Sequence, residues 1–105
     1  MAESNSPTFD LRSAGCAAVS GTLSFATAGR LLAQGARCIG AGEADNIDLA
    51  GVKGTDSAGL ALLVEWLSIA KTAGRVLRYE NIPSQLLQLA KLSDVDGLLS
   101  GAKEA

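Results

Sequence analysis

The chain has 105 residues, 48% of them hydrophobic, which suits a single domain with one core. Nine lysine and arginine residues face eleven aspartate and glutamate residues, a formal net charge of -2, and the basic residues are scattered singly. This pattern excludes the basic stripe that tracks a phosphate backbone, so we expect no nucleic-acid partner.

The first predicted elements are two strands and a helix. Phe9 and Leu11 alternate with polar neighbours as in a half-buried strand. A turn at residues 13–15 leads to a short β-compatible run at residues 16–20, and the two strands are predicted to pair as an antiparallel hairpin. Apolar residues at three- and four-residue spacing then predict a helix over residues 24–40.

A second strand-to-helix unit follows. A short strand is predicted over residues 46–50, whose apolar residues share one face. A helix is predicted over residues 57–73, with Asp56 or Ser57 as its N-cap. Gly74 stands just beyond the helix end, where a left-handed backbone is common.

The last part of the chain completes the fold prediction. We predict a strand over residues 75–80, a helix that begins at Pro83, and a short apolar segment at residues 95–99 that is a candidate fifth strand. This order predicts an α/β fold: a mixed four- to five-stranded sheet with a parallel centre, flanked by three or more helices. We expect a flexible tail over residues 1–7 and one domain over residues 8–100.

The predicted helix at residues 57–73 has two apolar faces. They comprise Leu60, Leu63, Val64, Leu67 and Ala70 on one side and Ala58, Leu62, Trp66, Ile69 and Ala73 on the other. A narrow strip separates them: Ser57, Ala61, Glu65, Ser68 and Thr72. The helix is therefore either wedged between the sheet and a neighbouring helix or offers a surplus face to another protein. We expect Trp66 to be buried and the strip to face outwards.

Catalysis is not expected. The junction Thr55-Asp56-Ser57-Ala58-Gly59 differs from the G-x-S-x-G nucleophile elbow only at its first residue. However, the chain contains no histidine, so it cannot assemble a Ser-His-acid triad. Ala70-Lys71-Thr72 lacks the glycine that precedes the lysine of a phosphate-binding P-loop. We predict a protein that is not an enzyme and uses no cofactor.

A metal site is not expected either. Asp45, Asp48 and Asp56 are the carboxylates that suggest a hard-metal cluster, but the first two flank the predicted strand at a spacing that need not converge. We interpret them as solvated strand-end carboxylates. Cys16 and Cys38 show no zinc or disulfide pattern, which favours a reduced, intracellular protein.

The chain shows no sign of membrane insertion. Its first seven residues are polar and include an acid, Glu3, where a secretory signal has bases. No apolar run approaches the ~20 residues that span a bilayer. We expect a cytoplasmic protein without direct membrane insertion.

Two neighbouring segments carry a family resemblance. The strand segment Ile47-Asp48-Leu49-Ala50-Gly51-Val52 and the helix start Thr55-Asp56-Ser57-Ala58-Gly59-Leu60 resemble the signature of STAS domains, "hDLsxV" followed by "hDSxGL". The resemblance extends in element order over roughly residues 9–99. It implies the STAS fold and a docking function exerted through the helix start.

Two branches of the family are relevant. Anti-sigma-factor antagonists typically read D-S-[ST]-G and are phosphorylated on the second hydroxyl, a position held here by Ala58. MlaB-type proteins, the STAS subunits of Mla phospholipid ABC transporters, read D-T-G-G-L-A-L-L followed by a helix that ends near L-A-K. Asp56–Leu63 and Ile69-Ala70-Lys71 are similar to this pattern, and Leu89-Ala90-Lys91-Leu92 is a further likeness. The essential threonine of this branch falls on Ser57, and the MlaB-type branch is the better match.

The MlaB-type resemblance implies a function and a partner. It implies a cytoplasmic subunit, peripheral to the inner membrane, that binds the ATPase subunit of the transporter and, indirectly, the membrane permease. Such a subunit supports assembly and activity in outer-membrane lipid asymmetry. The residues expected to contact the partner are Thr55, Asp56, Ser57, Ala58, Gly59, Ala61, Glu65 and Ser68. The alternative is an anti-sigma-factor antagonist switched by phosphorylation of Ser57.

Overall fold

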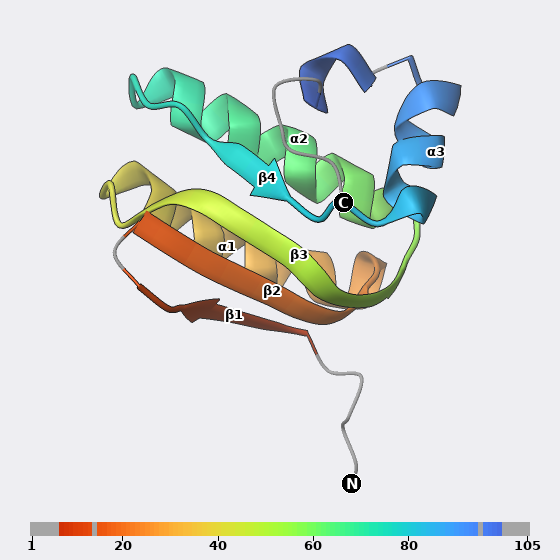
Figure 1. Cartoon of the computed structure of the whole chain (residues 1–105), viewed down its shortest axis with the longest axis horizontal. Helices are drawn as coiled ribbons and strands as arrows, with labels where there is room; N and C mark the ends of the chain where they lie inside the picture. The colour runs from red at the N-terminus through yellow and green to blue at the C-terminus, as the bar shows by residue number, and fades with distance from the viewer. Residues whose placement is uncertain (1–6, 14, 95, 100–105) are drawn as a thin grey trace, which may run out of the picture.

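A computed structural model describes residues 7–13, 15–94 and 96–99, and within them the strands form one four-stranded sheet (Figure 1). The strands lie in chain order: β1 (Thr8–Leu11), β2 (Gly15–Leu23), β3 (Ala44–Thr55) and β4 (Arg78–Glu80). β1 is antiparallel to β2, whereas β2–β3 and β3–β4 are parallel pairs. The predicted hairpin and the mixed sheet with a parallel centre are therefore confirmed.

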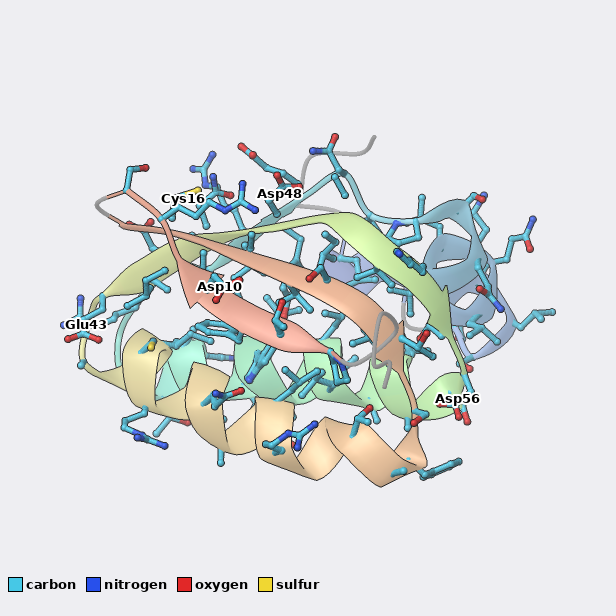
Figure 2. All side chains as sticks on the ribbon, turned by 90° about the horizontal axis from the view of Figure 1, so that it is seen from below. Asp10, Cys16, Glu43, Asp48 and Asp56 are labelled. Atoms are coloured by element: carbon cyan, nitrogen blue, oxygen red, sulfur yellow. The ribbon has the colours of Figure 1, made fainter. Side chains whose placement is uncertain are left out.

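Two helices make the crossovers that parallel strands require. α1 (Phe25–Gly40) joins β2 to β3, and α2 (Ser57–Thr72) joins β3 to β4. Both crossovers move in the same direction across the sheet, so a common handedness places both helices on one face (Figure 2). α3 (Ser84–Leu92) and a 3₁₀ helix, η1 (Asp96–Leu99), follow β4.

Trp66 occupies the centre of the packing between α1 and α2 and is fully buried, as predicted. Its indole lies against Gly35 of α1, where an added Cβ would come within 2.5 Å of Trp66 Cζ2. The indole Nε1 donates a hydrogen bond to the carbonyl oxygen of Leu32 at 3.3 Å, and the ring meets Phe9 edge-to-face with centroids 5.6 Å apart. The glycine therefore fixes how closely the two helices approach.

Both apolar faces of α2 pack largely into the fold; Val64, Leu67 and Ile69 are half-buried and Ala73 at the helix end is exposed. Leu60, Leu63 and Ala70 are buried on one face, and Ala58, Leu62 and Trp66 on the other. The separating strip of Ser57, Ala61, Glu65, Ser68 and Thr72 is exposed along its whole length. The helix is thus wedged within the domain, and neither apolar face is left wholly uncovered.

Three of the strands differ in length from the prediction. β2 and β3 extend beyond the predicted 16–20 and 46–50 because they continue to pair with each other until Leu23 meets Thr55, with register shifts on the way. β4 is shorter than the predicted 75–80. The amide of Arg75 instead donates to the carbonyl of Ala70 and closes the end of α2.

The candidate fifth strand is wrong. Residues 96–99 form the 3₁₀ helix η1, and the buried side chain of Leu99 joins the core; residue 95 lies outside the described residues. Asp94 just before it has a left-handed backbone, φ 60°, which turns the chain immediately after α3. A strand also needs a neighbour for its backbone groups, whereas a 3₁₀ turn satisfies them locally.

The helix ends agree closely with the capping signals. Gly74 has φ 73°, as its predicted position after α2 requires. Pro83 precedes α3 as its N-cap with ψ 143° and accepts hydrogen bonds from the amides of Leu86 and Leu87, so the helix begins one residue later than predicted, at Ser84.

Two further expectations concern the tail and the membrane. Residues 1–6 of the predicted tail and residue 100 of the predicted domain lie outside the described residues. Among the helices that the structure describes, none is long and apolar enough to cross a membrane.

Candidate functional site

A single residue, Asp56, separates the end of β3 from the start of α2. Thr55 is the last residue of β3, Asp56 is the N-cap with an extended backbone, and Ser57 is the first residue of α2. Asp56 Oδ1 accepts a hydrogen bond from the amide of Ala58 at 2.8 Å, which satisfies one of the free donors of the first helical turn. The prediction of Asp56 as a helix cap is confirmed.

Several contacts hold this junction against the neighbouring strand. The amide of Asp56 donates to the carbonyl of Leu23 in β2 at 3.3 Å, and Thr55 Oγ1 donates to the carbonyl of Asp56 at 3.0 Å. A Cβ on Gly59 would overlap Thr55 Oγ1 and lie 3.2 Å from Leu23 Cβ. Close backbone approach at Gly59 therefore packs the helix start inwards, onto the ends of β2 and β3.

Ser57 is the exposed polar residue of the junction. Its side chain projects from the first turn of α2, and its hydroxyl makes no hydrogen bond with any of the described residues. Ala61, Glu65 and Ser68 continue from it along the same exposed strip. The structure therefore brings the polar part of the predicted site together on one surface.

The other predicted site residues of the junction are half-buried or buried. Thr55 and Asp56 are half-buried, and Ala58 and Gly59 are buried, with Ala58 only 6% exposed. Their side chains or backbone build the junction and determine where Ser57 stands. A contact between them and a partner stays a prediction.

A groove beside the exposed strip was not predicted from the sequence. It lies between α1 and α2 and has a volume of about 320 Å³. Its lining residues have the same spacing on both helices: Phe25, Ala28, Gly29 and Leu32 on α1, and Ala58, Ala61, Leu62 and Glu65 on α2. The signal that could have found it is Phe25, a large apolar residue at a predicted helix start, which is 79% exposed.

The carboxylates singled out in the sequence do not converge. Asp45 is exposed near the start of β3, in agreement with its interpretation as a solvated strand-end carboxylate. Asp48 is half-buried within β3, so that interpretation is wrong for Asp48. Figure 2 shows Asp48 and Asp56 far apart along that strand. No group of three or more histidine, cysteine, aspartate or glutamate residues that could hold a metal ion occurs in the described part of the chain.

Asp48 has a structural role that its position in the strand explains. Its Oδ1 accepts hydrogen bonds from Asn81 Nδ2 and from the amide of Ala50, both at 2.9 Å. The bond from Asn81 first, and then the bond from the Ala50 amide, hold the pKa of Asp48 below its ordinary value. Asp48 thereby links β3 to the segment after β4.

The two cysteines are free thiols and lie in half-buried positions. Burial, and then the neighbouring Glu43 carboxylate, raises the pKa of the Cys38 thiol. A thiol of raised pKa is less often the reactive thiolate, so Cys38 lacks the environment of a nucleophile.

Comparison with known proteins gives one family match. The family model described as "Mlab, STAS domain" matches residues 11–100. Among curated proteins, none matches the chain.

Solved structures share the fold at low sequence identity. The unphosphorylated anti-sigma factor antagonist SpoIIAA is 12% identical with a TM-score of 0.64, covering 82% of each chain. The phosphorylated form of the Bacillus cell fate determinant SpoIIAA is 13% identical with a TM-score of 0.66, covering 89% of this chain and 86% of the other. A murine anion transporter, Solute Carrier 26 family member A9, is 20% identical with a TM-score of 0.53; 82% of this chain matches 14% of the transporter.

Proposed function

The chain belongs to the family of STAS domains described as Mlab, and we propose that it is the STAS subunit of a phospholipid (Mla-type) ABC transporter. In this proposal it stays in the cytoplasm, peripheral to the inner membrane, and binds the ATPase subunit of the transporter. Through the ATPase it supports the assembly and activity of the complex with the membrane permease, and thereby outer-membrane lipid asymmetry. It acts by docking rather than by catalysis.

The observation that carries the proposal is the state of the Ser57 side chain. The hydroxyl is exposed and has no hydrogen-bond partner in the described residues, while the backbone beneath it is held by the Asp56 cap. A free donor and acceptor on a rigid support loses little conformational entropy when a partner binds. Ser57 is therefore suited to a specific polar contact with another protein.

The strip behind Ser57 supports the same surface. Ala61, Glu65 and Ser68 follow it at three- or four-residue spacing and are all exposed. At 1.5 Å rise per residue, the strip from Ser57 to Ser68 extends about 16 Å. The small side chains of Ser57, Ala61 and Ser68 permit close approach, which fits the rim of a protein interface better than a site for a small ligand.

A substitution of Ser57 tests the proposal. Ser57→Arg places a bulky charge on the surface and should abolish co-purification with the ATPase subunit, whereas Ser57→Thr should retain it. Ser84→Arg is the matched control, because Ser84 is also the exposed first residue of a helix. If Ser57→Arg co-purifies with the ATPase as well as Ser84→Arg does, the proposal is wrong.

The alternative function is a phosphorylation-switched anti-sigma-factor antagonist. The position of Ser57 favours this alternative, because its hydroxyl stands at a helix N-terminus, where backbone amides and the helix dipole stabilise a phosphate. Ala58 disfavours it, because it replaces the hydroxyl expected in that branch. Incubating the chain with its candidate kinase and ATP, then weighing the intact protein, separates the two; one phosphate on Ser57 supports the alternative.

A further inference from the structure

The groove between α1 and α2 follows from the parallel arrangement of β2 and β3. Each strand feeds directly into its helix, so both helices begin at the same edge of the sheet. Phe25 and Ser57 are the equivalent first residues of α1 and α2, and both are exposed. The groove runs from these two starts along the facing edges of the helices, beside the exposed strip.

The backbone of the two helices that form the groove determines which kind of segment can bind there. Both walls are helices, whose amides and carbonyls already bond within the helix, so the groove offers no strand edge to an extended peptide. An extended peptide would leave its own buried backbone groups unpaired. A helix brings its backbone already satisfied and can lay one apolar face between two others.

Small residues allow such a helix to come close. Ala28 and Gly29 form the wall on α1, and Ala61 stands opposite them on α2. An added Cβ on Gly29 would meet no atom within 4 Å, which shows open space at that point. Side chains of a third helix can enter there without displacing the core.

The charges and apolar residues define the chemistry of the occupant. Phe25 is 79% exposed at one end of the groove, a surface that an apolar side chain can cover. Glu65 is the one charged residue among the lining residues, and it has no ion pair with the described residues. A lysine or arginine at the edge of the incoming helix would complement it.

We propose that this groove receives an amphipathic helix of the ATPase subunit, with an apolar anchor against Phe25 and a lysine or arginine opposite Glu65. The inference rests on the function proposed above and extends it. Ala61 and Glu65 belong both to the groove and to the exposed strip. The polar contact at Ser57 and the helix in the groove are therefore parts of one continuous interface.

Calorimetric titration of the purified ATPase subunit into the chain tests the inference. Phe25→Asp and Glu65→Lys should each weaken binding by roughly tenfold or more. Gly29→Leu should fill the groove and weaken binding while stabilising the fold, because leucine favours a helix more than glycine does. Val76→Asp is the matched control: Val76 is 71% exposed and follows the far end of α2, and the substitution should leave affinity unchanged.

Cross-linking identifies the segment that occupies the groove. A photoreactive benzophenone residue in place of Phe25 should capture a helical segment of the ATPase that carries a basic residue within one or two turns. Two outcomes overturn the inference: capture of an extended segment, or normal affinity of Phe25→Asp and Glu65→Lys when Ser57→Arg abolishes binding. If the wild-type chain does not bind the ATPase at all, both the proposed function and this inference are wrong.

Discussion

The close contact between Gly35 and Trp66 makes Gly35→Ala a stringent test of the packing between α1 and α2. The new Cβ would overlap the indole, which is fully buried and cannot move aside without displacing its neighbours. Overpacking of a core costs about 1–3 kcal/mol. Loss of the hydrogen bond from Trp66 Nε1 to the carbonyl of Leu32 costs about 1 kcal/mol more. The higher helix propensity of alanine offsets at most ~1 kcal/mol of this loss.

The net expectation is a loss of about 2 kcal/mol in the free energy of unfolding, a drop in Tm of roughly 10 °C for a domain of this size. Urea and thermal unfolding measure it, and the emission of Trp66, the single tryptophan of the chain, should change in the folded state. Gly29→Ala in the same helix is the control; its Cβ meets nothing within 4 Å, so it should stabilise the fold by ~0.5–1 kcal/mol. If the two variants are equally stable and Trp66 emission is unchanged, the inferred close contact between Gly35 and the Trp66 indole is wrong.

Three smaller predictions concern hydrogen bonds. Asp56→Ala should lower the free energy of unfolding by ~1 kcal/mol in urea titrations through loss of the helix cap, and a neutral effect would contradict the cap. Tyr79→Phe should destabilise by ~1 kcal/mol, because the buried hydroxyl donates to the carbonyl of Leu63 at 2.6 Å; thermal unfolding measures the loss, and an unchanged Tm would contradict it. Because the folded-state pKa of Asp48 is lowered, its charge stabilises the fold above the ordinary value of 3.8 and this stabilisation is lost as pH falls through the folded-state pKa. The stability advantage of the wild type over Asp48→Asn should therefore be present at pH 7 and shrink below pH 3.8; a difference independent of pH would refute this.

The elements of the fold follow from local signals in the sequence. Helix α2 begins just after its capping residue Asp56 and is followed by Gly74, and both signals depend only on neighbouring residues. The alternation of strands and helices, which is also visible in local sequence patterns, predicts the parallel crossovers. Exposure of the strip on α2 also follows from helical periodicity.

What the sequence does not reveal depends on residues far apart in the chain. The lengths of β2 and β3 are determined by their mutual pairing, which continues through Gly21 and Gly51, residues that are weak strand formers. The groove requires Phe25 of α1 and Glu65 of α2, 40 positions apart in the chain, to line the same hollow, and no local pattern links them. Local signals thus single out Ser57 as a candidate contact, whereas the groove beside it follows only from the tertiary structure.

The order of the strands has a consequence for how the proposed interface forms during synthesis. Each strand pairs with the strand just before it in the chain, so no segment must wait for a distant one to find its neighbour. The hydrogen bonds of the Asp56 junction and the walls of the groove all come from residues 23–65. The junction and the groove of the proposed interface are therefore built from one continuous stretch of the chain, and β4 and α3 close the core behind them.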